Sequence, residues 1–255
     1  MNFKRTLILF IVLFIALSLC SLFMQFPVWV FYVLIALFLL LLIVGSFSMS
    51  HNFFLKSFTN LNSYQSDAIA LTFDDGPHPL YTPKVLALLK KYKVKATFFC
   101  IGKNAEKYPE LVQQIVDAGH TIGNHSFSHK PYIGFKGTKC WIEELEKNDA
   151  VLEAILGKKP VLFRPPYGVT TPHLAKAIEF TKHTVIGWSL RTYDTSPIRH
   201  KDAMLKSIQR NIEPGAVILL HDTHKNIPYI LEHTLIYLQH HGYRTVSVNE
   251  LIDEK

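Results

Sequence analysis

The amino-terminal segment carries no charged residue between Arg5 and Lys56. The apolar run splits at Met24-Gln25-Phe26-Pro27 into blocks of roughly residues 6–23 and 28–44. Each block is close to the shortest length that crosses a bilayer as a helix. The sequence therefore predicts a membrane segment over residues 1–50, formed by two transmembrane helices in a hairpin, with the lipid bilayer as its partner.

The orientation of this segment has more than one solution. Lys4 and Arg5 favour a cytoplasmic amino terminus, and two spans would return the rest of the chain to the same side. If this charge signal is too weak to set the topology, both ends face outward instead. A cleaved signal peptide over the first block is a further alternative, because a basic start followed by an apolar stretch is also its pattern. The side of the membrane that the remaining chain faces is therefore left open.

Length and composition indicate one domain after the membrane segment. The chain has 255 residues and a formal net charge of +7, which suits a domain near anionic headgroups or acidic glycans. Aromatic-basic repeats and nucleic-acid-binding motifs are missing from the sequence, so no nucleic-acid partner is expected. Cys20 lies in the first apolar block, which leaves only Cys100 and Cys140 in the domain and implies no disulfide framework.

Residues 51–66 are predicted to be a linker and residues 67–255 a folded domain. Helical stretches begin at Pro83 and Pro109, and the longest helix stops at Gly157. They alternate with seven apolar, β-rich runs at 68–73, 96–101, 120–123, 161–163, 184–190, 216–220 and 245–248.

This alternation predicts an α/β fold of parallel β-α units. A closed eight-fold barrel commonly needs about 250 residues, more than the domain offers. We therefore expect a distorted, reduced (β/α) barrel of about seven strands. Because all of these strands lie after Asp67, the segment before it is expected to contribute anchorage only.

A pair of carboxylates and a pair of imidazoles are the chief candidates for chemistry. Asp74 and Asp75 lie before Gly-Pro in Thr-Phe-Asp-Asp-Gly-Pro, and His125 and His129 follow in His-Ser-Phe-Ser-His. One carboxylate and two imidazoles make three metal ligands and leave coordination positions open, as in catalytic rather than structural sites. The second carboxylate would lie beside the ion and accept a proton.

These residues, together with Arg164-Pro165-Pro166-Tyr167-Gly168 and Leu219-Leu220-His221-Asp222, resemble the motifs of the polysaccharide deacetylase family, the NodB-like enzymes of carbohydrate esterase family 4. The resemblance covers about residues 67–250 and implies a distorted (β/α) barrel. Each motif also lies at or just past the carboxyl end of a predicted strand, the end at which barrel enzymes place their sites.

The resemblance implies a role for each motif residue. Asp75, His125 and His129 would bind a divalent metal, with Zn²⁺ preferred and Co²⁺, Mn²⁺ or Ni²⁺ also compatible with these ligands. Asp74 would be the general base and Arg164 would orient it. The remaining expected roles are the backbone N–H of Tyr167 as an oxyanion donor and His221 as the acid that protonates the departing amine.

The family's fourth motif is only partly present. It aligns with Arg191, Asp194 and Thr195, and of these only Asp194 matches. Asp194 is therefore the expected carboxylate partner of His221, with Asp222 as the second candidate. Tyr167 and Trp188 are expected either to contact substrate or to pack in the wall of the site. The histidines outside the motifs are expected at the surface: His173, His183, His200, His233, His240 and His241.

The sequence thus predicts a membrane-anchored, metal-dependent hydrolase of amide bonds that removes N-acetyl groups from a glycan. Two alternatives stay open. A deacylase or deformylase of a lipid-linked aminosugar is favoured if the domain is cytoplasmic, and a non-catalytic glycan-binding relative is suggested by Arg191 and Thr195. The sequence leaves the sugar, the metal and the oligomeric state undetermined.

Overall fold

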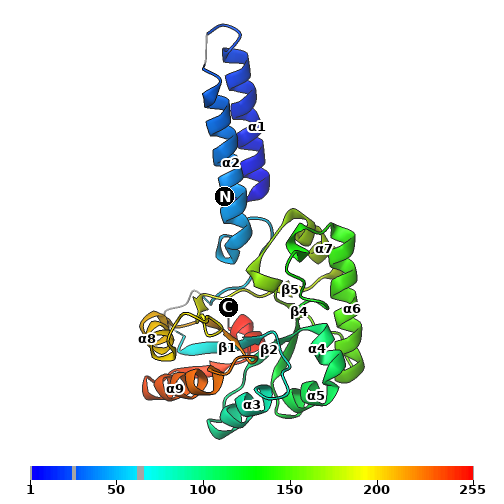
Figure 1. Cartoon of the computed structure of the whole chain (residues 1–255), viewed down its shortest axis with the longest axis vertical. Coiled ribbons are helices and arrows are strands. Elements are labelled where there is room, and N and C mark those ends of the chain that lie inside the picture. The colour runs from blue at the N-terminus through cyan, green and yellow to red at the C-terminus, as the bar shows by residue number, and fades with distance from the viewer. Residues whose placement is uncertain (1, 25–26, 62–65, 255) are drawn as a thin grey trace.

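The computed structural model describes residues 2–24, 27–61 and 66–254. Residues 25 and 26 of the predicted break between the apolar blocks, and residues 62–65 of the predicted linker, lie outside this range. The two apolar blocks form α1 (Phe3–Cys20) and α2 (Trp29–Phe47), which lie side by side as a hairpin (Figure 1). Both are long and apolar enough to cross a membrane, and most of their side chains are exposed in the chain itself.

The rest of the chain forms one parallel sheet surrounded by helices. Along the sheet the strands run in the order β5-β4-β3-β2-β1-β7-β6, and β8 pairs with the start of β1. Their bounds are β1 Ala68–Asp74, β2 Thr97–Cys100, β3 Thr121–Asn124, β4 Leu162–Phe163, β5 Thr184–Val185, β6 Leu190–Arg191, β7 Val217–His221 and β8 Arg244–Val246.

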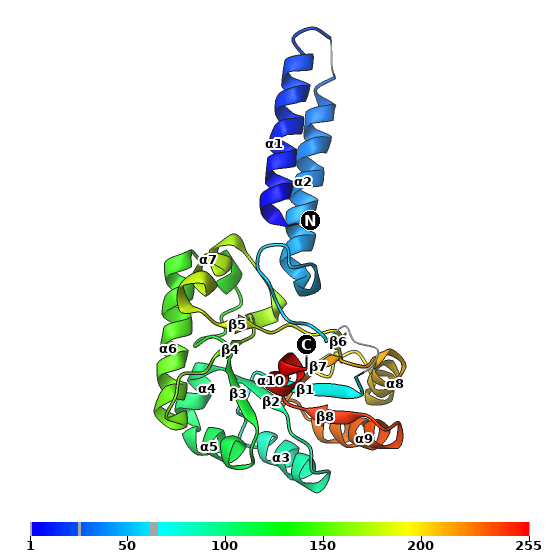
Figure 2. The same ribbon diagram turned by 180° about the vertical axis from the view of Figure 1, so that it is seen from behind.

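The helices of the domain form an incomplete ring around this sheet, and α1 and α2 extend from one side of the ring (Figures 1 and 2). The α-helices are α3 Thr82–Lys91, α4 Gly102–Lys107, α5 Pro109–Asp117, α6 Thr138–Leu156, α7 Pro172–Thr181, α8 Lys201–Asn211, α9 Ile227–His240 and α10 Val248–Asp253. Short 3-10 turns lie at η1 Met49–His51, η2 Ile133–Phe135 and η3 Pro166–Gly168. The predicted reduced (β/α) barrel is confirmed.

The helix boundaries follow the predicted signals. Pro83 and Pro109 lie in the first turns of α3 and α5, where the missing N–H of proline costs no helical hydrogen bond. Gly157 ends α6 with a φ of 70°, a left-handed conformation that glycine adopts without strain.

Strand alternation decides which side chains face the interior of the sheet. In β1, Ile69 and Phe73 pack toward the helices, whereas Ala68 and Ala70 belong to the inner cluster. The same period of two puts Asp74 on the inner face. The register pairs Asp74 with His221 at the end of β7, so both candidate side chains lie at one end of the sheet.

One predicted strand, 184–190, is divided in two. It forms β5 and β6, separated by Ile186–Ser189. In this gap the carbonyls of Ile186 and Gly187 accept hydrogen bonds from Arg164, and the Gly187 N–H donates to the carbonyl of Phe58. These long-range partners use backbone groups that a continuous strand would pair, which explains why the local pattern did not predict the break.

Residues 57–61, inside the predicted linker, pack between the two ends of the sheet, where β5 and β6 lie. The Phe58 N–H donates to the carbonyl of Val185, and the Leu61 N–H donates to the carbonyl of Gly215. Leu61 is buried in the inner cluster, and Met49 is buried in a cluster with Trp141. Met49 and residues 57–61 therefore contribute hydrogen bonds and apolar surface to the barrel, so the expectation that the segment before Asp67 contributes anchorage only is wrong.

Candidate active site

The candidate site lies at the carboxyl end of the sheet, where four predicted motifs meet. Asp74 ends β1 and His221 ends β7, while His125 follows β3 and Arg164 follows β4. Parallel strands deliver the residues at their carboxyl ends to the same edge of a sheet. Residues that are far apart in the chain are therefore brought together here.

Asp75, His125 and His129 form a compact set of candidate metal ligands. One ligand atom from each lies within 4.8 Å of the others, and Asp75 Oδ1 is 3.4 Å from His125 Nε2 and 3.3 Å from His129 Nε2. Asp75 Oδ1 is buried and has no hydrogen-bond partner in the part of the chain that the structure describes. A buried, unpartnered carboxylate oxygen facing two ring nitrogens fits a divalent cation.

The histidine tautomer agrees with this arrangement. His125 Nδ1 lies 2.7 Å from the carbonyl oxygen of Arg164. A carbonyl can only accept, so Nδ1 carries the proton and Nε2 directs its lone pair toward Asp75. The backbone of Arg164 thus orients one ligand, while its side chain acts elsewhere in the site.

The charges of the cluster suit ligands that bind without first losing a proton. Burial by itself would raise the pKa of the Asp75 carboxyl, but the adjacent His125, His129 and His221 hold it well below its usual range. Burial and the neighbouring His125 lower the pKa of His129 to about 4. At neutral pH Asp75 is therefore ionised and His129 neutral, as metal ligands must be.

Asp74 is held by one oxygen and directs the other toward the cluster. Arg164 Nη1 donates to Asp74 Oδ1 at 2.8 Å, and Asp74 Oδ2 lies 3.8 Å from His125 Nε2. Arg164 is completely buried, with its guanidinium 4.3 Å from the ring centre of Phe99. It also donates to the Thr72 hydroxyl at 2.7 Å. Asp74 therefore has a fixed orientation.

His221 is paired with Asp194, the carboxylate expected from the fourth motif. His221 Nδ1 lies 2.9 Å from Asp194 Oδ1, and the His221 backbone N–H donates to Oδ2 at 2.8 Å. Burial would lower the pKa of His221, but the hydrogen bond to Asp194 and the charges of Asp74 and Asp75 raise it to about 9. At neutral pH the imidazole is therefore protonated.

Asp222 lies elsewhere. Its fully buried carboxyl accepts a hydrogen bond from the Thr82 hydroxyl and fills the space beside Gly76, so that a Cβ at Gly76 would clash with it. Burial raises the pKa of Asp222 to about 7. It supports the turn after Asp75, and the structure places Asp194 rather than Asp222 against the His221 ring.

The aromatic candidates line one wall of the site. Tyr167 is half exposed, and its hydroxyl lies 3.3 Å from the carbonyl oxygen of His129. Trp188 is half-buried and packs over Gly168, where a Cβ would meet the indole. The guanidinium of Arg191 lies over Trp188 at 6.0 Å, on the exposed side of β6. Whether Tyr167 and Trp188 contact a substrate stays a prediction.

Several residues in the site or near it in the chain have left-handed backbone conformations. Asp75, Ser126, His129, Tyr167 and Tyr193 have φ between 47° and 73°. This conformation is costly for residues with a Cβ and collects where the surrounding structure imposes it, often at functional sites. At Asp75 it turns the chain just after β1. Together with strand alternation, this turn brings two neighbouring carboxylates into one site.

A buried polar network supports the histidine loop and was not expected from the sequence. Asn124 accepts from the Ser126 N–H at 2.8 Å and donates to Asp149 at 2.7 Å. Asn148 Nδ2, fully buried on α6, lies 3.0 Å from the carbonyl oxygen of Ser126. The sequence offered one signal of this network: Asn148 and Asp149 are adjacent polar residues at core-facing positions of an amphipathic helix.

The surface placement of His183 is wrong. His183 is buried, and its Nε2 lies 3.0 Å from Asp149 Oδ1. The residue precedes β5, and the partner comes from α6, so the pairing depends on helix-to-sheet packing. A local pattern of polar residues does not reveal such a contact.

Comparison with known proteins shows what the whole domain is similar to. A family model described as "Polysaccharide deacetylase" matches residues 62–186. A peptidoglycan-N-acetylglucosamine deacetylase of Bacillus cereus is 38% identical over 160 residues, covering 63% of this chain. The chain spans 58% of that relative's length.

Solved structures share the fold. One of a peptidoglycan N-acetylglucosamine deacetylase has a TM-score of 0.71 and 33% identity and covers 76% of this chain and 91% of the other. One of a CE4 family pseudoenzyme from Bacillus anthracis has a TM-score of 0.70 and 30% identity and covers 76% and 68%. Similarity to both kinds of protein makes the residues of the site decisive.

Proposed function

Because the chain belongs to the polysaccharide deacetylase family, we propose that it is a membrane-anchored, metal-dependent hydrolase that removes N-acetyl groups from an amino-sugar glycan. The observation that carries the proposal is the set of three ligands, Asp75, His125 and His129, beside a base and an acid that each have a fixed partner. The names of the similar proteins suggest peptidoglycan as the substrate class.

The ligands Asp75, His125 and His129 would hold the metal, most simply Zn²⁺. When bound, a divalent ion supplies Lewis-acid polarisation of the amide carbonyl and lowers the pKa of a coordinated water. Asp74 accepts a proton at Oδ2 from the attacking water, because its Oδ1 is engaged by Arg164.

His221 provides the acid. Its Nδ1 is held by Asp194, and its Nε2 lies 4.0 Å from Asp75 Oδ2 and so faces the site. The protonated ring can donate from Nε2 to the amine nitrogen as the amide bond breaks. The backbone N–H of Tyr167 is the proposed donor to the developing oxyanion.

The hairpin of α1 and α2 is the proposed anchor. No charged residue lies between Arg5 and Lys56, and nearly all side chains of both helices face outward. An exposed apolar surface of this size is expected to be covered by lipid. Resistance of the full chain to alkaline extraction from membranes tests the anchor, and a reporter fused to the carboxyl terminus shows which side the domain faces.

Acetate release by the full chain tests the activity. The substrates are peptidoglycan fragments, chitin oligomers and lipid-linked aminosugars, each assayed with added Zn²⁺ and after chelation. We expect release from an N-acetylated glycan that stops on chelation and in Asp74→Asn. Glycan binding without acetate release under any metal would refute the hydrolase and place the chain with the pseudoenzyme. Release from lipid-linked sugars alone would favour the cytoplasmic deacylase.

A further inference from the structure

The loop between His129 and α6 exposes aromatic rings next to lysines. Tyr132 is 73% exposed and Phe135 is 90% exposed, and Lys130 and Lys136 flank them. No acidic residue occurs in the sequence between Asp117 and Glu143. Single exposed rings are common on proteins, but paired rings with lysines are typical of segments that lie at a membrane interface.

The rings point outward from an ordered loop. Ile133 is buried in the cluster that contains Met49 and Trp141. Within the loop the Ile133 N–H donates to the carbonyl of Lys130 at 3.1 Å, and the Lys136 N–H donates to the carbonyl of Ile133 at 3.0 Å. Ile133 therefore anchors the loop while its neighbours Tyr132 and Phe135 remain in solvent.

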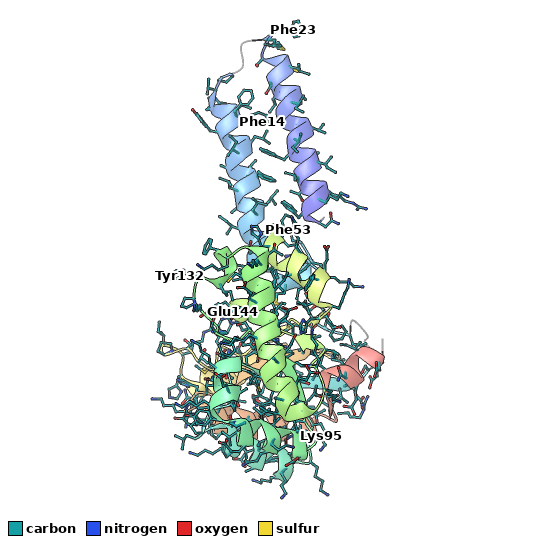
Figure 3. All side chains as sticks on the ribbon, turned by 90° about the vertical axis from the view of Figure 1, so that its right-hand side faces the viewer. Phe14, Phe23, Phe53, Lys95, Tyr132 and Glu144 are labelled. Carbon is teal, nitrogen blue, oxygen red and sulfur yellow. The ribbon has the colours of Figure 1, made fainter. Side chains whose placement is uncertain are left out.

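Ile133 also connects the loop to the foot of the hairpin, because it shares a buried cluster with Met49. Met49 lies two residues after the end of α2, and the Thr170 N–H donates to the carbonyl of Ser46 in the last turn of α2 at 2.9 Å. Figure 3 shows Tyr132 in the part of the domain from which the hairpin emerges, below Phe53 at the foot of the hairpin. A bilayer spanned by α1 and α2 would have its headgroup layer beside this loop.

We propose that residues 130–136 form a membrane-docking loop. Tyr132 and Phe135 enter the interfacial layer of the leaflet, and Lys130 and Lys136 contact anionic phospholipid headgroups. The inference rests on the proposed anchoring by α1 and α2. Because the loop directly follows the candidate ligand His129, docking would hold the mouth of the site at a set height on the membrane and favour glycan close to the bilayer.

A sugar platform is the competing interpretation, since aromatic rings beside a glycan site also stack on sugar rings. The absence of acidic side chains from this stretch of sequence and the continuity with the hairpin favour lipid. The two occupants differ in chemistry, so a probe placed on the loop can distinguish them.

The test uses the full chain reconstituted in vesicles, with a photoreactive benzoylphenylalanine in place of Phe135. The matched control carries it in place of Ile236, which is 49% exposed on α9, away from the hairpin (Figure 1). On irradiation we expect phospholipid adducts at 135 and almost none at 236. Adduct yield at 135 should rise when phosphatidylglycerol replaces part of the phosphatidylcholine.

Charge reversal provides the second measurement. Each lysine near an anionic surface contributes roughly fivefold to its affinity. Lys130→Glu with Lys136→Glu should therefore abolish the rise with phosphatidylglycerol, while acetate release from a soluble oligomer in detergent is retained. Both lysines lie outside the candidate catalytic set, so that activity also reports correct folding.

Two outcomes would refute the proposal that the loop docks on the membrane. In the first, lipid adducts at position 135 are no more abundant than at position 236. In the second, the probe at position 135 forms adducts with added glycan and not with lipid. Alkaline extraction and acetate release, measured on the same vesicles, separate this failure from others. A chain that resists extraction and gives no lipid adduct at 135 refutes the loop alone. If alkali extracts the chain from the vesicles, both the anchoring by α1 and α2 and the docking of the loop are refuted. Lipid adducts without acetate release refute only the proposed hydrolase activity.

Discussion

Replacing Asp194 by asparagine tests whether the buried carboxylate of Asp194 raises the pKa of His221. Asp194 is fully buried, with Oδ1 2.9 Å from His221 Nδ1. Asparagine keeps the shape and an acceptor oxygen but removes the negative charge. We expect Asp194→Asn to fold and to lower the pKa of His221 from about 9 toward its ordinary value of 6.5.

The size of the effect follows from these two values. At about pH 8, a histidine with a pKa near 9 is roughly nine-tenths protonated, whereas one with an ordinary pKa is protonated to only about 3%. The acid form of His221 therefore decreases about thirtyfold. Turnover by Asp194→Asn at that pH should fall by one to two orders of magnitude, within the range that loss of a positioned acid produces.

The same difference links protonation to stability. The folded-state pKa of His221 is raised above the unfolded value, so its stabilising effect is complete below pH 6.5 and is lost as pH rises through about 9. A shift of this size corresponds to about 3 kcal/mol. Across that interval the wild type should therefore lose stability relative to Asp194→Asn.

The assay is acetate release as a function of pH, with an NMR titration of His221 in the metal-free protein. A bound cation near Asp75 would lower the pKa of His221 in both proteins, so the displacement between them is the measured quantity. Asp222→Asn is the matched control, because Asp222 is equally buried but contacts Thr82 and the turn at Gly76. An alkaline limb that is unchanged in Asp194→Asn, or displaced only in Asp222→Asn, would refute the pairing.

Asp75→Ala should lose bound metal, whereas Asp74→Asn should keep it and lose about 10²- to 10⁴-fold in turnover, as metal analysis and acetate release will show; near wild-type turnover in Asp74→Asn would rule out the base. Arg164→Met leaves the buried Asp74 carboxylate without its partner and should cost about 3–5 kcal/mol in denaturant unfolding. Adding Asp74→Asn should restore part of that loss, and strict additivity would contradict the coupling. A chain starting at Asp67 lacks Met49 and Leu61, whose burial is worth about 1.5–3 kcal/mol each. It should unfold at a lower denaturant concentration than one starting at Ser48, and equal midpoints would show that residues 48–66 do not stabilise the barrel.

The sequence alone indicated the class of fold and the position of most strands. Strand runs such as 68–73 and 216–220 are short, apolar and followed by polar motif residues, and proline and glycine marked the ends of the helices. These signals are local, because they depend on backbone conformation and on the period of the apolar side chains. The signal for the predicted hairpin was also local, because the absence of charged residues between Arg5 and Lys56 can be read directly from the sequence.

The tertiary structure decided the features that depend on distant partners. The strand at 184–190 is interrupted because Arg164 and Phe58 take its backbone groups, and His183 is buried because Asp149 on α6 meets it. Neither contact produces a repeating pattern of side chains that could be recognised in the sequence.

The site shows the same division. The residue types proposed to bind a metal and to act as base and acid can be read from the motifs. Which oxygen of Asp74 is free, and which carboxylate pairs with His221, depends on angles set by the packing of β1, β4 and β7. A side chain's neighbours in space, and therefore its pKa and orientation, are determined only when separate strands deliver them to one edge of a sheet.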